Sequence, residues 1–268
     1  QLGNEVSLWV PGKVHVPWQE LSFFYGLNTP FSVNWLFSRP QLKRYDFSVL
    51  AFQKASKWQA DIIYTWLPQT AILGLLRGYP IVLEVHDRPM GKLGPNLLTW
   101  VTKIKGHKRL AIITRALAQA LEHEFHLKLN EEILVISPNG ADLERYSDLP
   151  DPLSARQKLN LPQRFTAVYA GHLYPGRGMD LLIGLAKALP EVEFLWVGGQ
   201  PQSVLEWRDR IQVLGLENVT LTGFVNNQQL PLYQASGEVL LMPYELRVEG
   251  SSGGNSADIC SPMKMFEY

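Results

Sequence analysis

The stretch RFTAVYAGHLYPGRGMDLLIGLAKAL (residues 164–189) decides the fold class of this chain. It begins with a short, almost fully apolar run, passes through a loop with three glycines, and continues with apolar residues at helical spacing. Short apolar strands that alternate with helices are typical of a parallel sheet covered by helices on both faces. The stretch therefore predicts a strand, a tight loop and a helix of an α/β fold.

The same alternation extends over the rest of the chain. NEVSLWV, DIIYTW, IVLEV and EILVI are strand-like runs of the first half, and EFLWVG, NVTLTG and EVLLMPY are those of the second. A polar linker with two prolines, YSDLPDPLSA, separates the halves. We predict two Rossmann-like, doubly wound domains, residues 1–148 and 149–268, with a ligand cleft beyond the carboxyl ends of their strands.

Both ends of the sequence suggest a piece of a longer protein. The chain opens on QLGNEVSLWV, without the strand that should start a doubly wound domain, and closes on PMKMFEY, the first turns of a helix. We therefore expect the first strand and helix of the N-terminal domain to be missing, and the C-terminal domain to be truncated.

Composition excludes several classes of protein. Among 268 residues, Lys plus Arg is 25 and Asp plus Glu is 25, whereas a dedicated nucleic-acid binder should have a basic surplus. Cys260 is the only cysteine, so no internal disulfide can form, which suits a reducing compartment. No apolar run reaches the roughly 18 residues of a membrane span. We predict a cytoplasmic protein, with peripheral contact at the inner face of a membrane as the alternative.

The loop AGHLYPGRG (residues 170–178) is suited to holding a phosphate group without hydrolysing it. Arg177 and Gly178 stand where a P-loop needs Lys and Ser or Thr, and Leu181 stands where a dinucleotide fingerprint needs its third glycine. Glycines allow the backbone to approach a ligand, helix N-termini attract anions, and the arginine fork matches phosphate oxygens. A plain connecting loop is the structural alternative.

Further sequence motifs accompany the loop along the chain. After its helix come VGG (residues 197–199), LTGFV (residues 221–225) and SPMKMFEY (residues 261–268); the first half contributes GNEVSLWVP, ADIIYTW, IVLEVHD and VISPNGAD. Over its whole length the chain resembles the retaining glycosyltransferases of family 4, with the GT-B fold. The resemblance implies transfer of a sugar from a nucleotide-diphosphate sugar to an acceptor hydroxyl, with retention of the anomeric configuration and without a metal ion.

The resemblance also implies a donor site in the second domain. Arg177 matches the basic residue on the diphosphate, Glu267 the carboxylate on the ribose hydroxyls, and Phe224 and Val225 would flank the base. His172 stands where a second arginine is common. The residues implied for nucleotide and diphosphate binding are Gly171, His172, Gly176, Arg177, Gly178, Gly198, Gly199, Phe224, Val225, Ser261, Pro262, Lys264 and Glu267.

The first domain also contributes residues to the expected site, and the chain departs from the family motif at one position. His86 and Asp87 are the candidate catalytic residues, and Asn139 and Gly140 would shape the floor of the cleft. Ile259 stands where the family's first motif glutamate should fall, next to Asp258. A branch of the family carries S-P-x-K-x-x-E-Y instead, in which Ser261 and Pro262 would open the last helix.

No cofactor is implied beyond the donor itself, and no D-x-D metal motif is present. The expected partners are a nucleotide sugar and a sugar, lipid-linked or small-molecule acceptor, as in polysaccharide or glycolipid biosynthesis. Two alternatives stay open: a GT-B-type sugar-nucleotide epimerase and a catalytically silent nucleotide-sugar binder. The G-x-S-x-G match at 250–254 is rejected as a hydrolase motif, because no histidine follows it.

Overall fold

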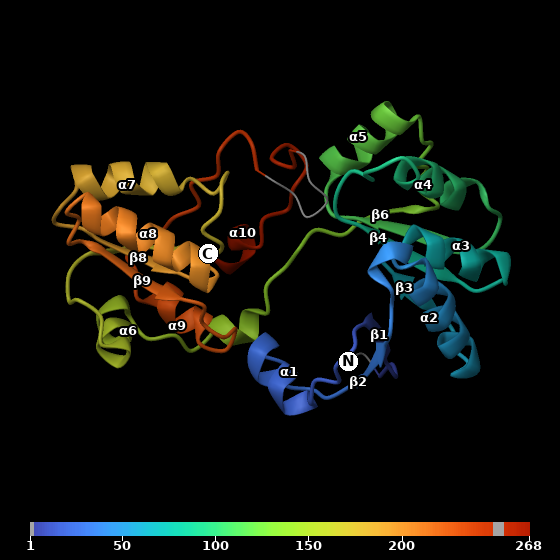
Figure 1. Ribbon diagram of the computed structural model, residues 1–268, viewed down its shortest axis with the longest axis horizontal. Helices are drawn as coiled ribbons and strands as arrows, with labels where there is room; N and C mark the ends of the chain where they lie inside the picture. Colours follow the sequence, from blue (N-terminus) through green and yellow to red (C-terminus); the bar gives the residue numbers. More distant parts are fainter. Residues whose placement is uncertain (1–2, 249–254) are drawn as a thin grey trace. The chain divides into compact units, whose positions relative to one another are not determined.

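The computed structural model describes residues 3–248 and 255–268 of the chain (Figure 1). The chain forms two compact units. Unit 1 comprises Gln1–Trp18, Thr29–Asn139 and Gly250–Ser261, and unit 2 comprises Gln19–Asn28, Gly140–Glu249 and Pro262–Tyr268. The sequence predicts one boundary near 148. The structure instead divides the chain after Asn139 and again after Ser261, so unit 1 includes a segment from near the C-terminus.

Unit 1 alternates strands and helices along the chain. Its strands are β1 (Ser7–Pro11), β2 (Ser32–Leu36), β3 (Ile63–Thr65), β4 (Ile81–Val85), β5 (Lys108–Ile112) and β6 (Leu134–Ile136). Its helices are α2 (Tyr45–Lys57), α3 (Pro68–Leu76), α4 (Gly94–Lys103) and α5 (Arg115–Phe125), with a 3₁₀ turn at Pro40–Leu42. Local signals explain the boundaries: α3 has proline in its first turn, and the Thr114 hydroxyl caps α5 by accepting from the Leu117 amide.

The strands of unit 1 form two parallel sheets, β1-β2 and β3-β4-β5-β6. One core lies on one face of the four-stranded sheet, where Ile81, Leu83 and Val85 of β4 pack against side chains of α2 to α5. The residues that alternate with them, Val82 and Glu84, are only half-buried. Ala111 of β5, which is paired with Glu84 and lies on the same face, is buried.

A cavity of about 440 Å³ lies between β1 and β3 in unit 1. Side chains of both strands and of α2 line it, among them Trp9, Phe52, Trp58 and Ile63. No ladder joins β1 to β3 in the described part of the chain. The further strand expected upstream of Gln1 stays a prediction.

Unit 2 has a single parallel sheet. Its strands are β7 (Thr166–Ala170), β8 (Glu193–Val197), β9 (Val219–Gly223) and β10 (Val239–Leu240), in the order β10-β7-β8-β9. Its helices are α1 (Trp18–Tyr25), α6 (Pro152–Leu159), α7 (Met179–Ala188), α8 (Pro201–Val213), α9 (Leu230–Ala235) and α10 (Lys264–Glu267), with a 3₁₀ turn at Leu143–Tyr146.

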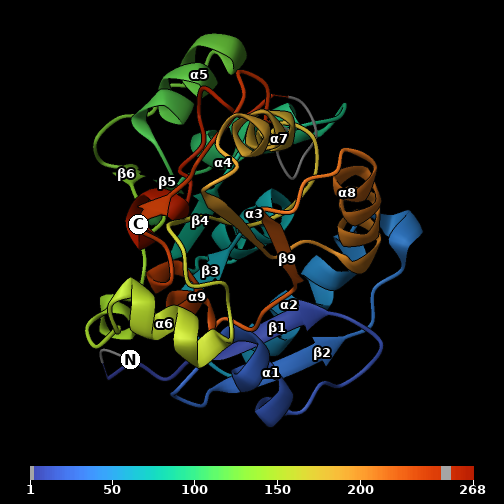
Figure 2. The ribbon, with the colours of Figure 1, turned by 90° about the vertical axis from the view of Figure 1, so that its left-hand side faces the viewer.

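Both faces of the unit 2 sheet are covered. On one face Tyr169 and Trp196 pack against side chains of α7 and α8, and on the other Val168 and Leu195 pack near Leu230 and Tyr233 of α9. Figures 1 and 2 show α7 and α8 on the side of the sheet opposite to α6 and α9. Every residue of β7 and β8 is buried, which explains why the residues that follow Thr166 and Glu193 are apolar without alternation. The predicted α/β fold of parallel sheets with alternating helices is confirmed.

Candidate functional site

The loop 171–178 of unit 2 joins the carboxyl end of β7 to the first residue of α7. Gly171 leaves the strand with φ +151°, and Gly178 caps the helix with φ +75°. Both angles belong to backbone conformations that glycine adopts without a steric penalty. The loop is therefore a tight strand-to-helix connection, as its sequence predicts.

The structure gives a specific reason for the glycines at 176 and 178. A Cβ at Gly176 would come within 2.5 Å of the Arg247 carbonyl oxygen, and a Cβ at Gly178 would overlap the Pro243 carbonyl. The segment that follows β10 therefore packs directly on the loop. At these two positions the loop is in contact with the chain's own backbone, and the predicted contacts of Gly176 and Gly178 with a ligand stay predictions.

One amide at the start of α7 already has an acceptor. Gly178 donates its N–H to Glu245 Oε1 at 3.2 Å. A carboxylate is favourable at this place because the helix dipole and the unpaired amides attract negative charge. In this structure the Gly178 amide is therefore hydrogen-bonded within the chain, and its role in diphosphate binding stays a prediction.

Arg177 lies among aromatic rings. Its Cζ is 5.1 Å from the centroid of the Tyr174 ring and 4.7 Å from that of Tyr244, and its NH2 donates to the Tyr174 hydroxyl at 3.0 Å. Within the described part of the chain, its buried Nε has no hydrogen-bond acceptor. The guanidinium is thus held in place with hydrogen-bonding capacity left over.

Lys264 comes from the other end of the unit's sequence to the same place. Its side chain is 8% exposed, and Nζ lies 5.1 Å from the centroid of the Tyr169 ring and 5.2 Å from that of Tyr244. Burial, and then the nearby Arg177 charge, lower the pKa of Lys264 to about 8, while Glu267 acts in the opposite direction. We call Arg177 and Lys264 the cation pair; both were predicted, but the tyrosines that join them were not.

Gly171 is tied to the cation pair by its lack of a side chain. A Cβ at this position would come within 2.6 Å of Lys264 Nζ and 3.2 Å of the Tyr169 hydroxyl oxygen. The Lys264 side chain can therefore occupy its position only because residue 171 is glycine.

His172 stacks on Tyr174, with ring centroids 5.0 Å apart and an interplanar angle of 28°. Partial burial, followed by the charges of Arg177 and Lys264, lowers its pKa. The imidazole is therefore neutral at pH 7. It can donate or accept a hydrogen bond there but adds no positive charge to the loop.

Glu267 lies on α10 with its carboxylate toward Gln234 and Tyr146. Its Oε2 accepts from Gln234 Nε2 at 3.1 Å. Burial, with Glu267 as the next cause, raises the pKa of the Tyr146 hydroxyl to about 12. Helix α10 begins at Lys264, so Ser261 and Pro262 precede the helix and do not open it, in contrast to the sequence analysis.

The glycines that follow β8 lie against the loop, whereas Phe224, which follows β9, contacts another aromatic ring. A Cβ at Gly198 would come within 2.5 Å of the Gly171 carbonyl oxygen, and one at Gly199 within 2.7 Å of Leu173. Phe224 stacks on Phe24, with centroids 4.7 Å apart and planes 17° apart, while Val225 is partly buried and packs against the buried residues of β7 and β8. Phe24 is thus a neighbour of the predicted base-flanking residue that sequence patterns did not reveal.

In unit 1, His86 follows β4 and approaches a carboxylate on that strand. Its Nε2 is 2.7 Å from Glu84 Oε1. Glu84 also accepts from Trp66 Nε1 at 2.5 Å and from the Tyr64 hydroxyl. The Trp66 indole and the Tyr64 hydroxyl therefore hold the Glu84 carboxylate beside the predicted catalytic histidine.

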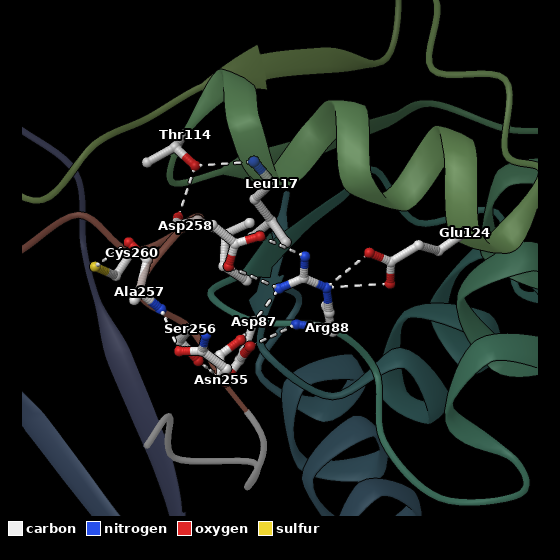
Figure 3. A network of polar contacts seen from close by, with 11 residues as sticks. Asp87, Arg88, Thr114, Leu117, Glu124, Asn255, Ser256, Ala257, Asp258 and Cys260 are labelled. Carbon is white, nitrogen blue, oxygen red and sulfur yellow. Dashed lines mark hydrogen bonds and ion pairs between the residues drawn. The ribbon is translucent and has the colours of Figure 1, made fainter. Parts of the chain in front are cut away.

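Asp87 has structural partners on both oxygens (Figure 3). Its Oδ1 accepts from the Arg88 amide at 2.8 Å, and its Oδ2 accepts from the Ser256 hydroxyl at 3.0 Å. The geometry suits an anchor for the segment 255–261. A catalytic role for Asp87 stays a prediction.

The segment 255–261 is bound to unit 1 by polar and apolar contacts. Arg88 pairs with Asp258 through NH2 at 2.8 Å and with Glu124 through Nε at 2.9 Å (Figure 3). Thr114 donates its hydroxyl to the Ile259 carbonyl at 2.7 Å. Ile259 itself is 1% exposed within the core of unit 1. The residue that departs from the family motif therefore has a packing function here.

Asn139 and Ser261, the last residues of two parts of unit 1, are hydrogen-bonded to each other. Asn139 donates its amide to Ser261 Oγ at 3.1 Å and its Nδ2 to the Ser261 carbonyl at 2.6 Å. Nothing lies within 4 Å of a Cβ built at Gly140. Asn139 thus has a clear bonding role, whereas space does not require glycine at 140.

Over residues 3–248 and 255–268, no three His, Cys, Asp or Glu side chains gather as a metal site. No helix within these ranges has the length and apolar character needed to cross a membrane. The rejected G-x-S-x-G match lies outside the described residues.

Sequence comparison identifies mannosyltransferases as homologues. The chain is 32% identical over 120 residues to a GDP-mannose-dependent alpha-(1-6)-phosphatidylinositol monomannoside mannosyltransferase of Mycolicibacterium smegmatis, which covers 42% of this chain and 31% of that protein. The enzyme of the same name from Mycobacterium tuberculosis H37Rv is 32% identical over 124 residues, with the same coverage. The chain thus spans about a third of the length of these curated relatives. No protein-family model matches it.

Solved structures of glycosyltransferases share the fold. Anabaena Alr3699/HepE in complex with UDP superposes with a TM-score of 0.62 and 21% identity, over 82% of this chain and 63% of that one. A glycosyltransferase from Rickettsia africae gives 0.64 at 13% identity, over 81% and 60%. Sucrose-phosphate synthase from Thermosynechococcus elongatus gives 0.59 at 18%, over 81% and 59%. The GT-B fold expected from the sequence is confirmed.

Proposed function

We propose that this chain, whose homologues are GDP-mannose-dependent mannosyltransferases and whose fold is that of GT-B glycosyltransferases, is part of an enzyme that moves a sugar from a nucleotide-diphosphate sugar to an acceptor hydroxyl. The observation that carries the proposal is the cation pair. It lies beside the loop at the carboxyl end of β7, the edge at which parallel sheets bind their ligands.

The cation pair suits a diphosphate that leaves during the reaction. Arginine offers a planar fork of donors, and lysine a compact charge with three donors, so together they can bind several phosphate oxygens. As the bond to the sugar breaks, negative charge grows on the leaving diphosphate. Cations already fixed in position stabilise that charge without reorganising, which is the usual source of catalysis in group transfer.

We base the finer parts of the proposal, which are the identities of the donor base, the sugar and the acceptor, on the names of the relatives. The names of the mycobacterial relatives specify GDP-mannose as donor and a phosphatidylinositol monomannoside as acceptor. We extend both to this protein: a guanosine diphosphate on the donor side and a mannose-bearing glycolipid on the acceptor side. Retention of configuration and independence of metal ions belong to the same proposal, because the cation pair can supply the charge that a metal would supply.

Binding of GDP to the 268-residue chain tests the coarse proposal. Isothermal titration should show one site, and Arg177→Ala should weaken GDP binding by about 1.5–3 kcal/mol, the range for hydrogen bonds to charged groups. Arg208→Ala removes the same charge from an exposed position on α8 and should leave affinity unchanged. Absence of GDP, UDP and pyrophosphate binding would refute the proposal.

Transfer by the full-length protein tests the finer parts. With EDTA present, mannose from GDP-mannose should appear on a mannosylated phosphatidylinositol acceptor, and the new linkage should keep the α configuration. UDP-glucose as the preferred donor would replace the guanosine and mannose assignments.

The buried Ile259 favours one alternative, a catalytically silent nucleotide-sugar binder. An apolar core residue at this place cannot contact the donor sugar as a glutamate would. Binding of GDP-mannose without turnover by the full-length protein would select that alternative.

A further inference from the structure

We propose that Tyr244 is a positioning residue of the diphosphate site, whose ring holds Arg177 and Lys264 side by side without neutralising either charge. The inference rests on the proposed function, since it assigns a role within the same site. Tyr244 belongs to the segment that follows β10, far in sequence from both cations.

The Tyr244 ring is shared by the cation pair. The centroid of the ring is 4.7 Å from Arg177 Cζ and 5.2 Å from Lys264 Nζ, and its hydroxyl oxygen is 3.4 Å from Lys264 Nζ. Each cation also lies against another described ring: Tyr174 for Arg177 and Tyr169 for Lys264. Tyr244 is therefore the ring through which the two side chains are held together.

Two like charges that contact the same ring repel each other. Arg177 contributes to the lowered pKa of Lys264, so their repulsion is felt across the site. Among residues 3–248 and 255–268, no carboxylate forms an ion pair with either cation. The negative faces of tyrosine rings provide the attraction instead, and cation–π attraction is stronger where water is excluded.

Rings differ from carboxylates in what they leave open. A carboxylate would accept the N–H groups of both cations and would compete with phosphate oxygens for them. An aromatic face attracts the positive charge but takes up few donors, and among residues 3–248 and 255–268 the Nε of Arg177 has no acceptor. The site therefore keeps two positive charges ready for an incoming diphosphate.

Other titratable groups also face the Lys264 ammonium and must be considered in any pH-dependent measurement. They are Tyr169 at the end of β7, His172 and Arg177 in the loop, Tyr244 itself, and Glu267 on α10. Glu267 acts to raise the pKa of Lys264 but does not form an ion pair with it. Within residues 3–248 and 255–268, the ring of Tyr244 is the one that lies within 5.2 Å of both cations.

The test compares rings of equal shape and different charge distribution. GDP and inorganic pyrophosphate are titrated calorimetrically into the 268-residue chain with Tyr, Phe or pentafluorophenylalanine at position 244. Tyr244→Phe should bind both probes within about twofold of wild type. The fluorinated ring, whose face no longer attracts cations, should weaken both by about tenfold.

Two further variants guard against misfolding. Tyr244→Glu lets both cations pair with a carboxylate, so it should fold but bind pyrophosphate at least about tenfold more weakly. Tyr233→Leu removes a ring of unit 2 that lies away from the cation pair, and should leave affinity unchanged. In a Lys264→Met background, fluorination at 244 should have a much smaller effect, because the two substitutions act through the same contact.

The outcomes distinguish a failure of the role proposed for Tyr244 from a failure of the proposed function. If wild type binds neither probe, both fail. If wild type binds, Arg177→Ala weakens binding, and the Phe, pentafluorophenylalanine and Glu variants all bind like wild type, Tyr244 has no positioning role and the proposed function stands.

Discussion

At residue 171 the side chains of Lys264 and Tyr169 leave no room for a Cβ. A Cβ there would press on the ammonium of Lys264, and φ is +151°. We expect Gly171→Ala to destabilise the protein by about 1–3 kcal/mol through backbone strain and to weaken GDP binding by displacing Lys264. Gly140→Ala is the matched control, because its Cβ would meet open space. Denaturant unfolding and titration calorimetry of both variants check this; equal stability and affinity would contradict the packing argument.

Lys264 should make stability depend on pH. Its pKa is about 8 in the folded chain and 10.5 ordinarily, so burial disfavours the charged form by about 3 kcal/mol below pH 8. Between pH 8 and 10.5 the unfolded chain binds the additional proton, so this group makes the free energy of unfolding rise with pH. Tyrosines titrate in the same range, and Lys264→Met isolates the lysine.

The measurement is the difference in unfolding free energy between Lys264→Met and wild type. It should be largest near pH 7 and shrink as pH rises through 8 toward 10, because the wild type loses the cost of a buried charge. A difference that stays constant over this range would show that Lys264 titrates normally.

Among the elements, the segment 255–261 shows which contacts matter for docking. Ile259 is 1% exposed, so Ile259→Ala should cost about 2–4 kcal/mol, the range for large-to-small core substitutions. The Asp258 side chain is 59% exposed, so Asp258→Ala should cost less than about 1 kcal/mol despite its ion pair with Arg88. Urea unfolding of the two variants compares them; a greater cost for Asp258→Ala would show that the ion pair dominates.

Local sequence patterns predicted the helices and strands better than they predicted which side chains contact one another in the folded chain. The apolar runs of β7 and β8, the glycines before α7 and the proline at the start of α3 each identify their element, because these signals act within a few residues. Tyr169, Tyr174 and Tyr244 meet two cations from distant parts of the chain. No spacing rule connects residues that meet only after folding, so the aromatic contacts could not be read from the sequence.

Ile259 is a second example of a tertiary contact that the sequence does not predict. The sequence showed that it departs from a motif, but an apolar residue in a polar segment does not say which core it joins. Its packing in unit 1, 145 positions after the Thr114 hydroxyl that binds its carbonyl, depends on the tertiary fold.

For the whole molecule, two units with separate cores predict a local response to ligand. GDP at 100 times its dissociation constant should stabilise the unit that binds it by about 2.7 kcal/mol. Amide exchange in β7 and β8 should slow by about a hundredfold, while exchange in β4 and β5 should not change. Hydrogen-exchange mass spectrometry reads both; equal slowing in both units would show that they unfold together.

The assignment of 255–261 to unit 1 has a practical consequence for dissecting this protein. A clone that stops at residue 148 would lose the heptapeptide carrying Ile259 and leave a hydrophobic hole where that side chain sat. If the halves of two related enzymes were joined at the linker, the segment 255–261 would come from a different enzyme than the core of unit 1 into which Ile259 packs. Chimeras should therefore carry the heptapeptide with the N-terminal half, for instance by fusing it behind Asn139, whose side chain already binds Ser261.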